Sequence, residues 1–282
     1  MPANKPTAKL AYIAIMLVAA GFLLMYLFRP SGTKQSNSGQ PNTPPIAPTA
    51  ASVEAAWATT LATGDAEAIK KALQAGSSPT APLAAAPNTG WTPLHVVSTR
   101  SVPGAIAALV AAGASPDAQT PDGTTPVWMA AQLGLIPCLN DLITANASVD
   151  KPDAQGRTAL MMAAAAAKPD AVQTLLAAGA AHNVADGTGI TALGYAVAVP
   201  GNSSIAKMLI EAGADPDVAD AQGVTPLMRA AERSDAEQVV MLMNYGASPA
   251  GKSKDGKSAL DRAKSRTDEA GKQVAGVLNQ AG

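Results

Sequence analysis

The chain has little of the chemistry on which catalytic and metal sites depend. Its 282 residues include one cysteine, Cys138, and two histidines, His95 and His182. A single cysteine excludes an intrachain disulfide framework and a cysteine-based zinc cluster. Twenty Lys and Arg stand against 21 Asp and Glu, so the sequence lacks the positive charge of a general polyanion binder. We therefore expect no metal, no cofactor, no nucleic-acid partner and no small-molecule substrate.

Aromatic residues are also scarce, at 3% of the chain, and four of the nine lie in the first 28 positions. Alanine, in contrast, fills 63 of the 282 positions. A core of small residues suits closely stacked helices, whereas β-sandwich strands favour β-branched and aromatic residues. The composition therefore predicts an all-α fold.

The N-terminal part predicts a membrane anchor. After a short tail, residues 1–9, residues 10–28 form a run of 19 without a charge, about 28 Å long as a helix and enough to cross a bilayer. A cleaved signal peptide is the alternative, but the run is long and no Ala-x-Ala site follows it. The short tail favours a single-pass protein with its C-terminal part translocated. In a bacterium, which the alanine-rich composition suggests, this is an inner-membrane protein with a periplasmic domain.

Residues 29–51 combine five prolines with Ser, Asn, Gln and Gly. A segment with so few bulky apolar side chains cannot bury a core, so we expect a disordered linker that is partly stiffened by proline.

The rest of the chain, residues 52–282, repeats at intervals of 33, 33, 33, 34 and 33 residues. The repeated unit has a glycine, any residue, Thr or Ser, Pro or Ala, and an apolar residue; the Thr or Ser stands at positions 92, 125, 158, 191, 225 and 258. A second set at the same period contains Gly76, Gly113, Asn146, Gly179, Gly213 and Gly246. Thr followed by Pro is typical of a helix start, and Gly or Asn after an apolar stretch is typical of a helix end.

These motifs resemble the ankyrin repeat family. The TPLH motif is intact at Thr92–His95, and the LLxxGA motif is intact at Leu175–Ala180. The resemblance implies an all-α solenoid of about seven helix-turn-helix units with projecting turns, non-catalytic and protein-binding. It also implies that His95 braces its turn. A degenerate first unit contains Gly64-Asp65-Ala66-Glu67 where its second helix would begin, and the last unit has a polar coat typical of a terminal cap.

Three further patterns suggest chemistry. Gly246–Ser253 fits the phosphate-binding pattern GxxxxGK[ST]. A phosphate-binding loop of this type follows a β-strand, whereas a helix is predicted before Gly246, so nucleotide binding is not expected. Asp215, Asp217 and Asp220 resemble part of a calcium loop without its final glutamate, so a solvated turn is expected. Cys138 has no basic neighbour in the sequence, which indicates a half-buried, inert thiol.

The candidate binding surface is a concave groove. In stacks of this kind the residue two after the Leu of TPL tends to face the groove, and these positions include Val96, Met129, Met162, Tyr195 and Arg229, with Trp128 beside them. Such side chains suit an apolar or amphipathic partner segment. The alternative is that the methionines only fill gaps between alanine-rich helices.

Anchor, linker and solenoid in series predict a membrane-tethered scaffold for protein–protein interaction. Two alternatives remain. In the first, the chain is an accessory subunit that is held in a membrane complex mainly through residues 10–28, whose small residues allow close helix packing. In the second, it is a periplasmic stress-protection protein.

Overall fold

The computed structural model describes residues 50–84, 89–233 and 235–281. The predicted anchor at residues 10–28 and most of the predicted linker at 29–51 lie outside these residues. The first described helix, α2, begins at Ala50, two residues before the predicted start of the repeats. No helix within the described ranges is long and apolar enough to span a membrane.

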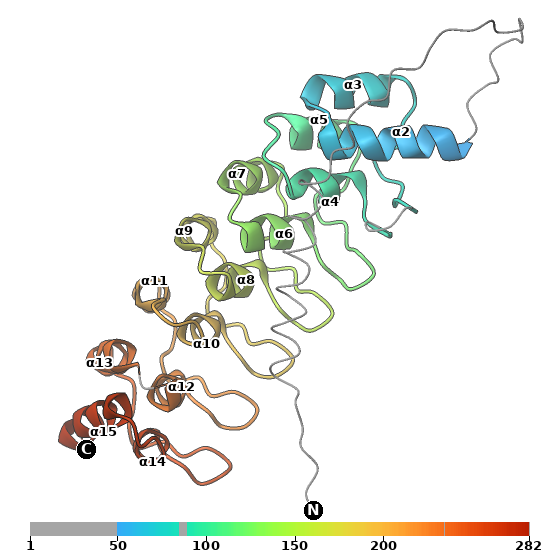
Figure 1. The fold of residues 1–282 in the computed structure, drawn as a ribbon. Helices are drawn as coiled ribbons and strands as arrows, with labels where there is room; N and C mark the ends of the chain where they lie inside the picture. The colour runs from blue at the N-terminus through green and yellow to red at the C-terminus, as the bar shows by residue number, and fades with distance from the viewer. Residues whose placement is uncertain (1–49, 85–88, 234, 282) are drawn as a thin grey trace, which may run out of the picture. The chain divides into compact units, whose positions relative to one another are not determined.

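The described helices form a linear stack of antiparallel pairs (Figure 1). The pairs run in chain order: α2 (Ala50–Thr63) with α3 (Ala66–Gln74), α4 (Pro93–Ser98) with α5 (Ala105–Ala111), α6 (Pro126–Leu133) with α7 (Ile136–Thr144), α8 (Ala159–Ala165) with α9 (Pro169–Ala177), α10 (Ala192–Val197) with α11 (Ser203–Glu211), α12 (Pro226–Arg233) with α13 (Ala236–Asn244), and α14 (Ala259–Lys264) with α15 (Glu269–Ala281). Seven helix pairs match the predicted number of units.

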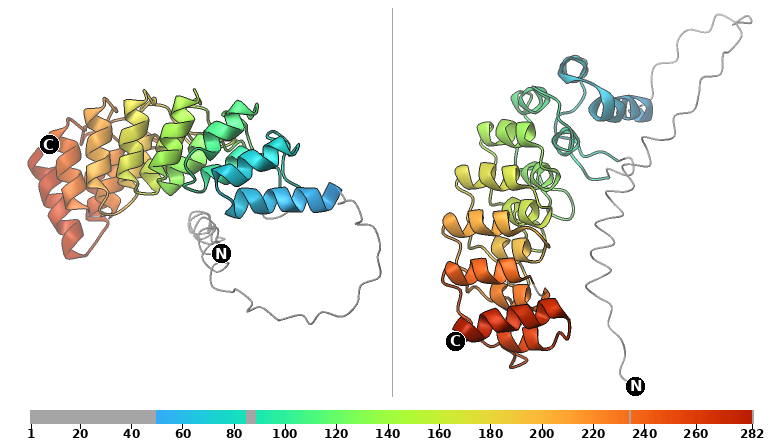
Figure 2. Two further views of the ribbon diagram at one scale, coloured as in Figure 1. Left: turned by 90° about the horizontal axis from the view of Figure 1, so that it is seen from above. Right: turned by 60° about the vertical axis from the view of Figure 1, so that its left-hand side comes forward.

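The stack has two parallel rows of helices and a row of projecting loops (Figure 2). We call the even-numbered helices from α4 to α14 the inner row, because they lie next to the loops, and their odd-numbered partners the outer row. The loops between one pair and the next project from the same side of the stack, and we call them hairpins. Inner row and hairpins together form one continuous surface.

The predicted helix starts are confirmed. The side chains of Thr125, Thr158 and Thr191 each accept a hydrogen bond from the backbone N–H three residues later, which supplies one of the partners that a helix N-terminus lacks. In the degenerate first unit Asp65 caps α3 in the same way, accepting from the N–H of Ala68 at 2.8 Å. The second helix of that unit therefore begins where the sequence indicates.

The helix ends are confirmed as well. The glycines after the outer helices have φ between 84° and 103°, and Asn146, their one replacement, has φ 59°. Only glycine, and to a lesser extent asparagine, adopts this left-handed conformation without a large steric cost.

The one-residue insertion near Pro200–Gly201 lies in the turn between α10 and α11, so the hairpins on either side keep their register.

Leucine at two repeating positions forms the core between the rows. On the inner row Leu94, Leu160, Leu193 and Leu227 are fully buried, and on the outer row Leu109, Leu142, Leu175, Leu209 and Leu242 are fully buried too. Each such burial contributes about 1.5–3 kcal/mol. Buried alanines such as Ala130, Ala163 and Ala230 let the inner helices approach closely.

Side chains from the outer row also reach back to the previous unit. The thiol of Cys138 donates to the Arg100 carbonyl at 2.7 Å, Asn202 Nδ2 donates to the Ala164 carbonyl at 3.0 Å, and Gln238 Nε2 donates to the Val199 carbonyl at 3.2 Å. The Arg100 and Val199 carbonyls lie in the turn between two helices, and the Ala164 carbonyl lies near the end of α8. Each such bond adds a directed polar contact to the buried interface between two units.

We predict that Ala167→Gly stabilises the protein. Ala167 has φ 51°, while its counterparts one unit before and one unit after are Gly134 and Gly201, at 71° and 72°. Because alanine pays about 1 kcal/mol or more for this conformation and glycine does not, the free energy of unfolding is expected to rise by about 1 kcal/mol in urea denaturation followed by circular dichroism.

The matched control is Ala166→Gly. Ala166 has φ −86°, an ordinary conformation for alanine, so glycine there is expected to lower the free energy of unfolding by roughly 0.5–1 kcal/mol. Equal effects of the two substitutions would contradict the assignment of strain to Ala167.

Candidate protein-binding surface

Five hairpins have a polar residue at the same position, and the backbone of this residue closes the turn. At Thr120, Asp153, Asp186, Asp220 and Ser253 the backbone N–H donates to the carbonyl four residues later. The carboxylates of Asp153, Asp186 and Asp220 also accept backbone N–H groups from the residues two and four positions later. Where Thr120 or Ser253 stands instead, its hydroxyl donates to an aspartate two residues on, Asp122 or Asp255. Each of these five hairpins thus uses one carboxylate to fix its turn.

Backbone hydrogen bonds join neighbouring hairpins. The N–H groups of Ala154, Gly187, Ala221 and Lys254 each donate to a carbonyl of the preceding hairpin at 2.8–3.0 Å. The glycine at each tip permits this approach: a Cβ on Gly123 would lie 2.6 Å from Ala154 N, and one on Gly189 would lie 2.7 Å from Ala221 N. The glycines two residues before the helix caps all have φ values of 76–83°, and all but Gly256 are also required by close contact with the next hairpin.

A second set of bonds runs along the base of the hairpins. The side chains of Asp117, Asp150, Asn183 and Asp217 each accept a backbone N–H from the next unit at 2.8–2.9 Å. With the bonds at the tips, this fixes each of these hairpins to its neighbour at two levels. The hairpin row is a rigid edge along the inner surface.

The predicted groove residues are packed rather than open. Val96, Met129 and Met162 are 4%, 7% and 4% exposed, and Trp128 is 8% exposed. Trp128, Met129 and Met162 form a cluster separate from the main core, with Trp91 packed against it, and Val96 belongs to the main core. This corrects the expectation of an open apolar groove and favours the alternative that the methionines fill space between helices. Their role in binding remains a prediction.

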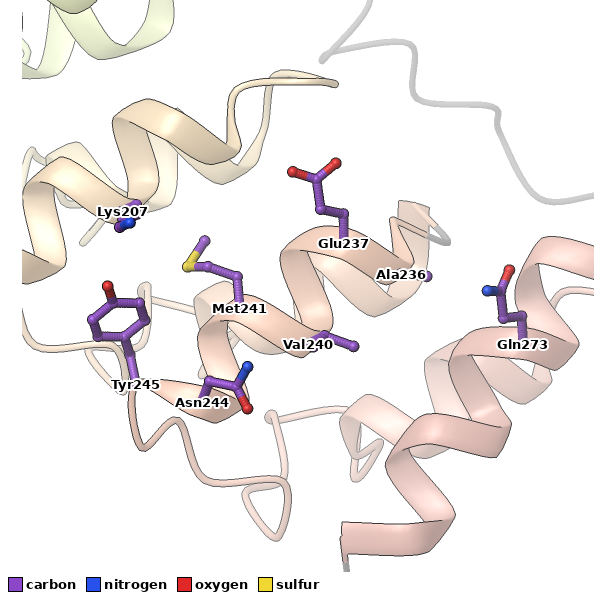
Figure 3. Close-up of a pocket in the computed structure, with 8 residues that line it drawn as sticks. All are labelled: Lys207, Ala236, Glu237, Val240, Met241, Asn244, Tyr245 and Gln273. Atoms are coloured by element: carbon purple, nitrogen blue, oxygen red, sulfur yellow. The ribbon is translucent and has the colours of Figure 1, made fainter.

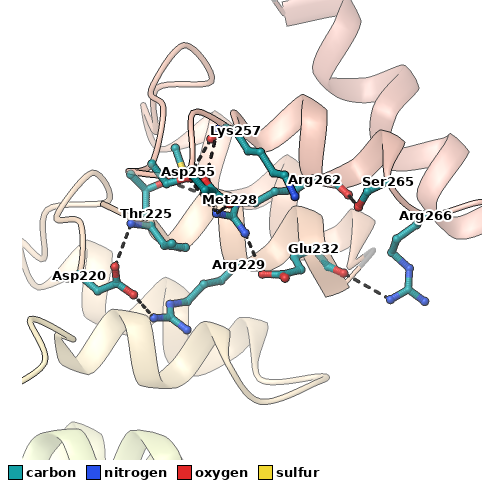
Figure 4. Close-up of polar contacts among 12 residues, drawn as sticks. Asp220, Thr225, Met228, Arg229, Glu232, Asp255, Lys257, Arg262, Ser265 and Arg266 are labelled. Atoms are coloured by element: carbon teal, nitrogen blue, oxygen red, sulfur yellow. Dashed lines mark hydrogen bonds and ion pairs between the residues drawn. The ribbon is translucent and has the colours of Figure 1, made fainter. Parts of the chain in front are cut away.

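Tyr195 and Arg229 are half-buried, and both bond to the carboxylate of their own hairpin. The Tyr195 hydroxyl donates to Asp186 Oδ2 at 2.7 Å, and the Arg229 guanidinium pairs with Asp220 Oδ2 (Figure 4). In the last unit Arg262 donates to Ser253 Oγ at 2.8 Å. The same spacing of nine residues separates the two members of each pair. These contacts hold the inner helix against its hairpin.

Where methionine takes this position, the carboxylate finds another partner. Met162 cannot donate to Asp153, and Arg157 does so instead, with Nε 2.7 Å from Asp153 Oδ2. The same guanidinium lies over the Trp128 ring, 5.5 Å from its centroid. The surface therefore changes along the stack from aromatic and sulfur-containing groups near α6 and α8 to arginines near α12 and α14.

A family model for ankyrin repeats, described as three copies, matches residues 100–186, 128–220 and 193–272. The chain belongs to the ankyrin repeat family. Its repeating hairpins and helix pairs are those of an ankyrin solenoid, and ankyrin repeats typically mediate protein–protein interaction. No curated protein matches the chain at a significant level.

His95 braces its ankyrin turn as the resemblance implied. Its Nδ1 accepts the Thr92 N–H at 3.1 Å, so Nε2 carries the proton and donates to the Thr124 carbonyl, also at 3.1 Å. Burial lowers the pKa of His95, and the hydrogen bond to the Thr124 carbonyl offsets this only in part. His95 is therefore neutral at pH 7 and connects two units. Tryptophan stands at the corresponding position of the next unit, where it forms the cluster with Trp91.

The remaining sequence candidates have structural roles. α13 precedes Gly246–Ser253, and Ser253 Oγ is engaged with Asp255 and the Lys257 carbonyl inside the hairpin. Within the described residues no group of three His, Cys, Asp or Glu side chains is arranged to hold a metal ion. Cys138 is 2% exposed, more buried than predicted, and burial followed by the nearby Asp141 charge raises the pKa of its thiol to about 11.

The outer row has an open depression of about 530 Å³ at α11, α13 and α15 (Figure 3). Val240 and Tyr245 are 40% and 37% exposed there, and Lys207, Glu237 and Gln273 lie around them. The Tyr245 hydroxyl donates to Glu211 at 2.8 Å. The repeat motifs of the sequence do not indicate this depression, because an exposed Val and Tyr on an outer helix form no motif of their own.

We predict that Tyr195→Phe destabilises the protein in a pH-dependent way. Desolvation acts to raise the pKa of Asp186, but hydrogen bonds from Tyr195, Ile190 and Thr188 outweigh it and lower the pKa. A lowered pKa means that the ionised carboxylate stabilises the fold above its unfolded pKa, about 3.9, and that this contribution is lost as pH falls through the folded value. Removing the hydroxyl is expected to cost about 1 kcal/mol at pH 7 and clearly less at pH 3, measured by urea unfolding at both values.

Tyr245→Phe is the control, since its hydroxyl bonds to an exposed carboxylate on the outer row. Little change in the unfolding free energy is expected at either pH. A Tyr195→Phe protein with the same loss at pH 3 as at pH 7 would show that the hydroxyl acts through packing and not through Asp186.

Proposed function

We propose that this ankyrin protein is a membrane-tethered scaffold that binds a partner protein through the hairpin row and the adjoining inner helices. The rigid hairpin row carries the proposal, because backbone bonds fix its shape while exposed side chains such as Gln155 and Gln222 remain free to vary. A preorganised surface loses little conformational entropy on binding. Ankyrin repeat proteins are generally interaction modules without catalytic activity, in accord with this proposal.

The membrane tether is supported by the sequence of residues 10–28 alone. We place the chain in the inner membrane of a bacterium as a single-pass protein with the repeats in the periplasm. The tether raises the effective concentration of a membrane-associated partner near the solenoid. An accessory subunit held through residues 10–28 remains the second candidate, supported by Ala14, Ala19, Ala20 and Gly21, which permit close packing of a helix against another.

The tether is tested by fractionation of cells that express the full chain. We expect the protein to resist extraction of the membranes at alkaline pH, and a chain lacking residues 1–29 to be released. Protease added to spheroplasts is expected to digest the repeats. Release of the full chain by alkali would contradict the anchor, and protection from protease would contradict the periplasmic orientation.

The binding surface is tested with two matched pairs of substitutions. Gln155→Arg with Gln222→Arg adds bulk and charge at two hairpin tips, and Gln173→Arg with Gln280→Arg makes the same change on exposed positions of the outer helices. Cross-linked affinity purification from native membranes is expected to recover a partner with the wild type and the outer pair, and at least tenfold less with the hairpin pair.

Replacing residues 10–28 with an unrelated membrane span separates the two candidate functions. A partner that is kept with the foreign span and lost with the hairpin pair supports the scaffold. The opposite result would assign the contact to the span and make the solenoid a spacer.

A further inference from the structure

Charge is divided unevenly along the solenoid. Residues 50–251 contain nine Lys and Arg against seventeen Asp and Glu, a net charge of −8, whereas residues 252–282 contain seven against four, a net charge of +3. Four exposed lysines dominate the last unit: Lys252, Lys254 and Lys257 in its hairpin, and Lys264 at the end of α14. We call these four residues the cationic cap.

The acidic groups of the last unit are occupied within that unit. Asp255 accepts from Ser253 and pairs with Arg262 at 3.2 Å. Asp261 completes the capping box of α14, accepting from the hydroxyl of the N-cap residue Ser258 at 2.7 Å, and Asp268 pairs with Arg266 at 2.7 Å. Within the described residues no lysine of the cationic cap forms an ion pair. Hydrogen bonds, and to a lesser extent the nearby charges of Lys252 and Lys264 at Asp261 and of Lys257 at Asp255, lower the pKa of those carboxyls, but residues 252–282 keep a net charge of +3.

The neighbouring arginines are not free in the same way. Arg229 pairs with Asp220, and Arg262 lies between Asp255 and Glu232 with a side chain that is 11% exposed (Figure 4). Bidentate recognition of a phosphate group favours arginine, which offers two parallel N–H donors, whereas lysine acts as a point charge. Because both arginines already pair with carboxylates, the cap itself offers only the flexible point charges of its lysines.

The size of the partner is limited by the rest of the solenoid. Exposed charges interact mainly within about 8 Å at physiological salt. A nucleic acid or an anionic bilayer extends well beyond this distance and meets the net charge of −8 on the other units. Next to the cap, the hairpin of residues 213–225 carries three aspartates, which also repel a long polyanion. A short run of carboxylates fits within the cap alone.

We propose that the cationic cap binds a short acidic segment of the partner protein. This inference rests on the proposed scaffold function and specifies the chemistry of one end of its binding surface. The segment binds in an extended conformation. The cap sets the polarity of binding, because only one end of the solenoid attracts carboxylates.

The experiment uses the full chain in detergent and a fluorescein-labelled peptide of eight glutamates, with a peptide of eight glutamines as the neutral probe. Binding is followed by fluorescence anisotropy. The cap variant carries Lys252→Glu, Lys254→Glu and Lys257→Glu. The control carries Lys70→Glu, Lys71→Glu and Lys207→Glu, which are exposed lysines elsewhere, and changes the net charge by the same amount. Circular dichroism checks that both remain folded.

The expected result is that the cap variant binds the glutamate peptide at least tenfold more weakly than the wild type, while the control stays within threefold. Equal weakening of both variants would overturn the proposal, because net charge alone would then explain binding. Failure of the wild type to prefer glutamates over glutamines would also overturn it. The same comparison is made with phosphatidylglycerol vesicles and with a DNA duplex. If either binds the wild type more tightly than the glutamate peptide does and loses this binding in the cap variant, the cap is assigned to an extended polyanion instead.

The cap variant is also carried through the affinity purification described above. A native partner recovered equally with the cap variant and the wild type overturns the acidic-segment proposal and leaves the scaffold function standing. A wild-type chain that recovers no partner through its hairpins overturns the scaffold function itself, whatever the peptide result.

Discussion

The backbone hydrogen bond between neighbouring hairpins is the contact on which the whole surface depends. It forms between main-chain atoms, so it does not specify the side chains around it, but it requires a glycine at each tip where a Cβ would meet the next hairpin, as at Gly123 and Gly189. Capping threonines, hairpin carboxylates and buried leucines all act to place two hairpins at the distance where this bond forms. Side chains at the exposed tips can then change without moving the backbone.

Much of the fold follows from local chemistry. Thr125 and Thr158 cap helices because of their hydroxyls, and Asn146 replaces glycine because it tolerates a left-handed backbone. These requirements act within a few residues, and a sequence shows them directly. The exposure of Met129 and Met162 does not follow in this way. It depends on how far each side chain folds toward a neighbouring unit, which a repeat pattern does not specify.

The roles of Tyr195 and Arg229 illustrate the same limit. Both stand at the position expected to face a partner, yet each bonds to an aspartate nine residues earlier in its own hairpin. For Asp220 the sequence predicts only a solvated turn. Once the hairpin is known to fold back over the inner helix, the nine-residue spacing becomes meaningful, and it recurs at Arg262. A contact across a turn is visible in sequence only after the shape of the turn is known.

The bonds from Cys138, Asn202 and Gln238 each cross a single interface. A mechanical load along the stack therefore passes through the interfaces in series, and none of these bonds shares it with a distant unit. The weakest interface yields first, while pairs of helices elsewhere keep their contacts. One released unit of 33 residues adds at most about 120 Å of extended chain. Under tension such a solenoid lengthens in discrete steps, and each step can reverse when the load falls.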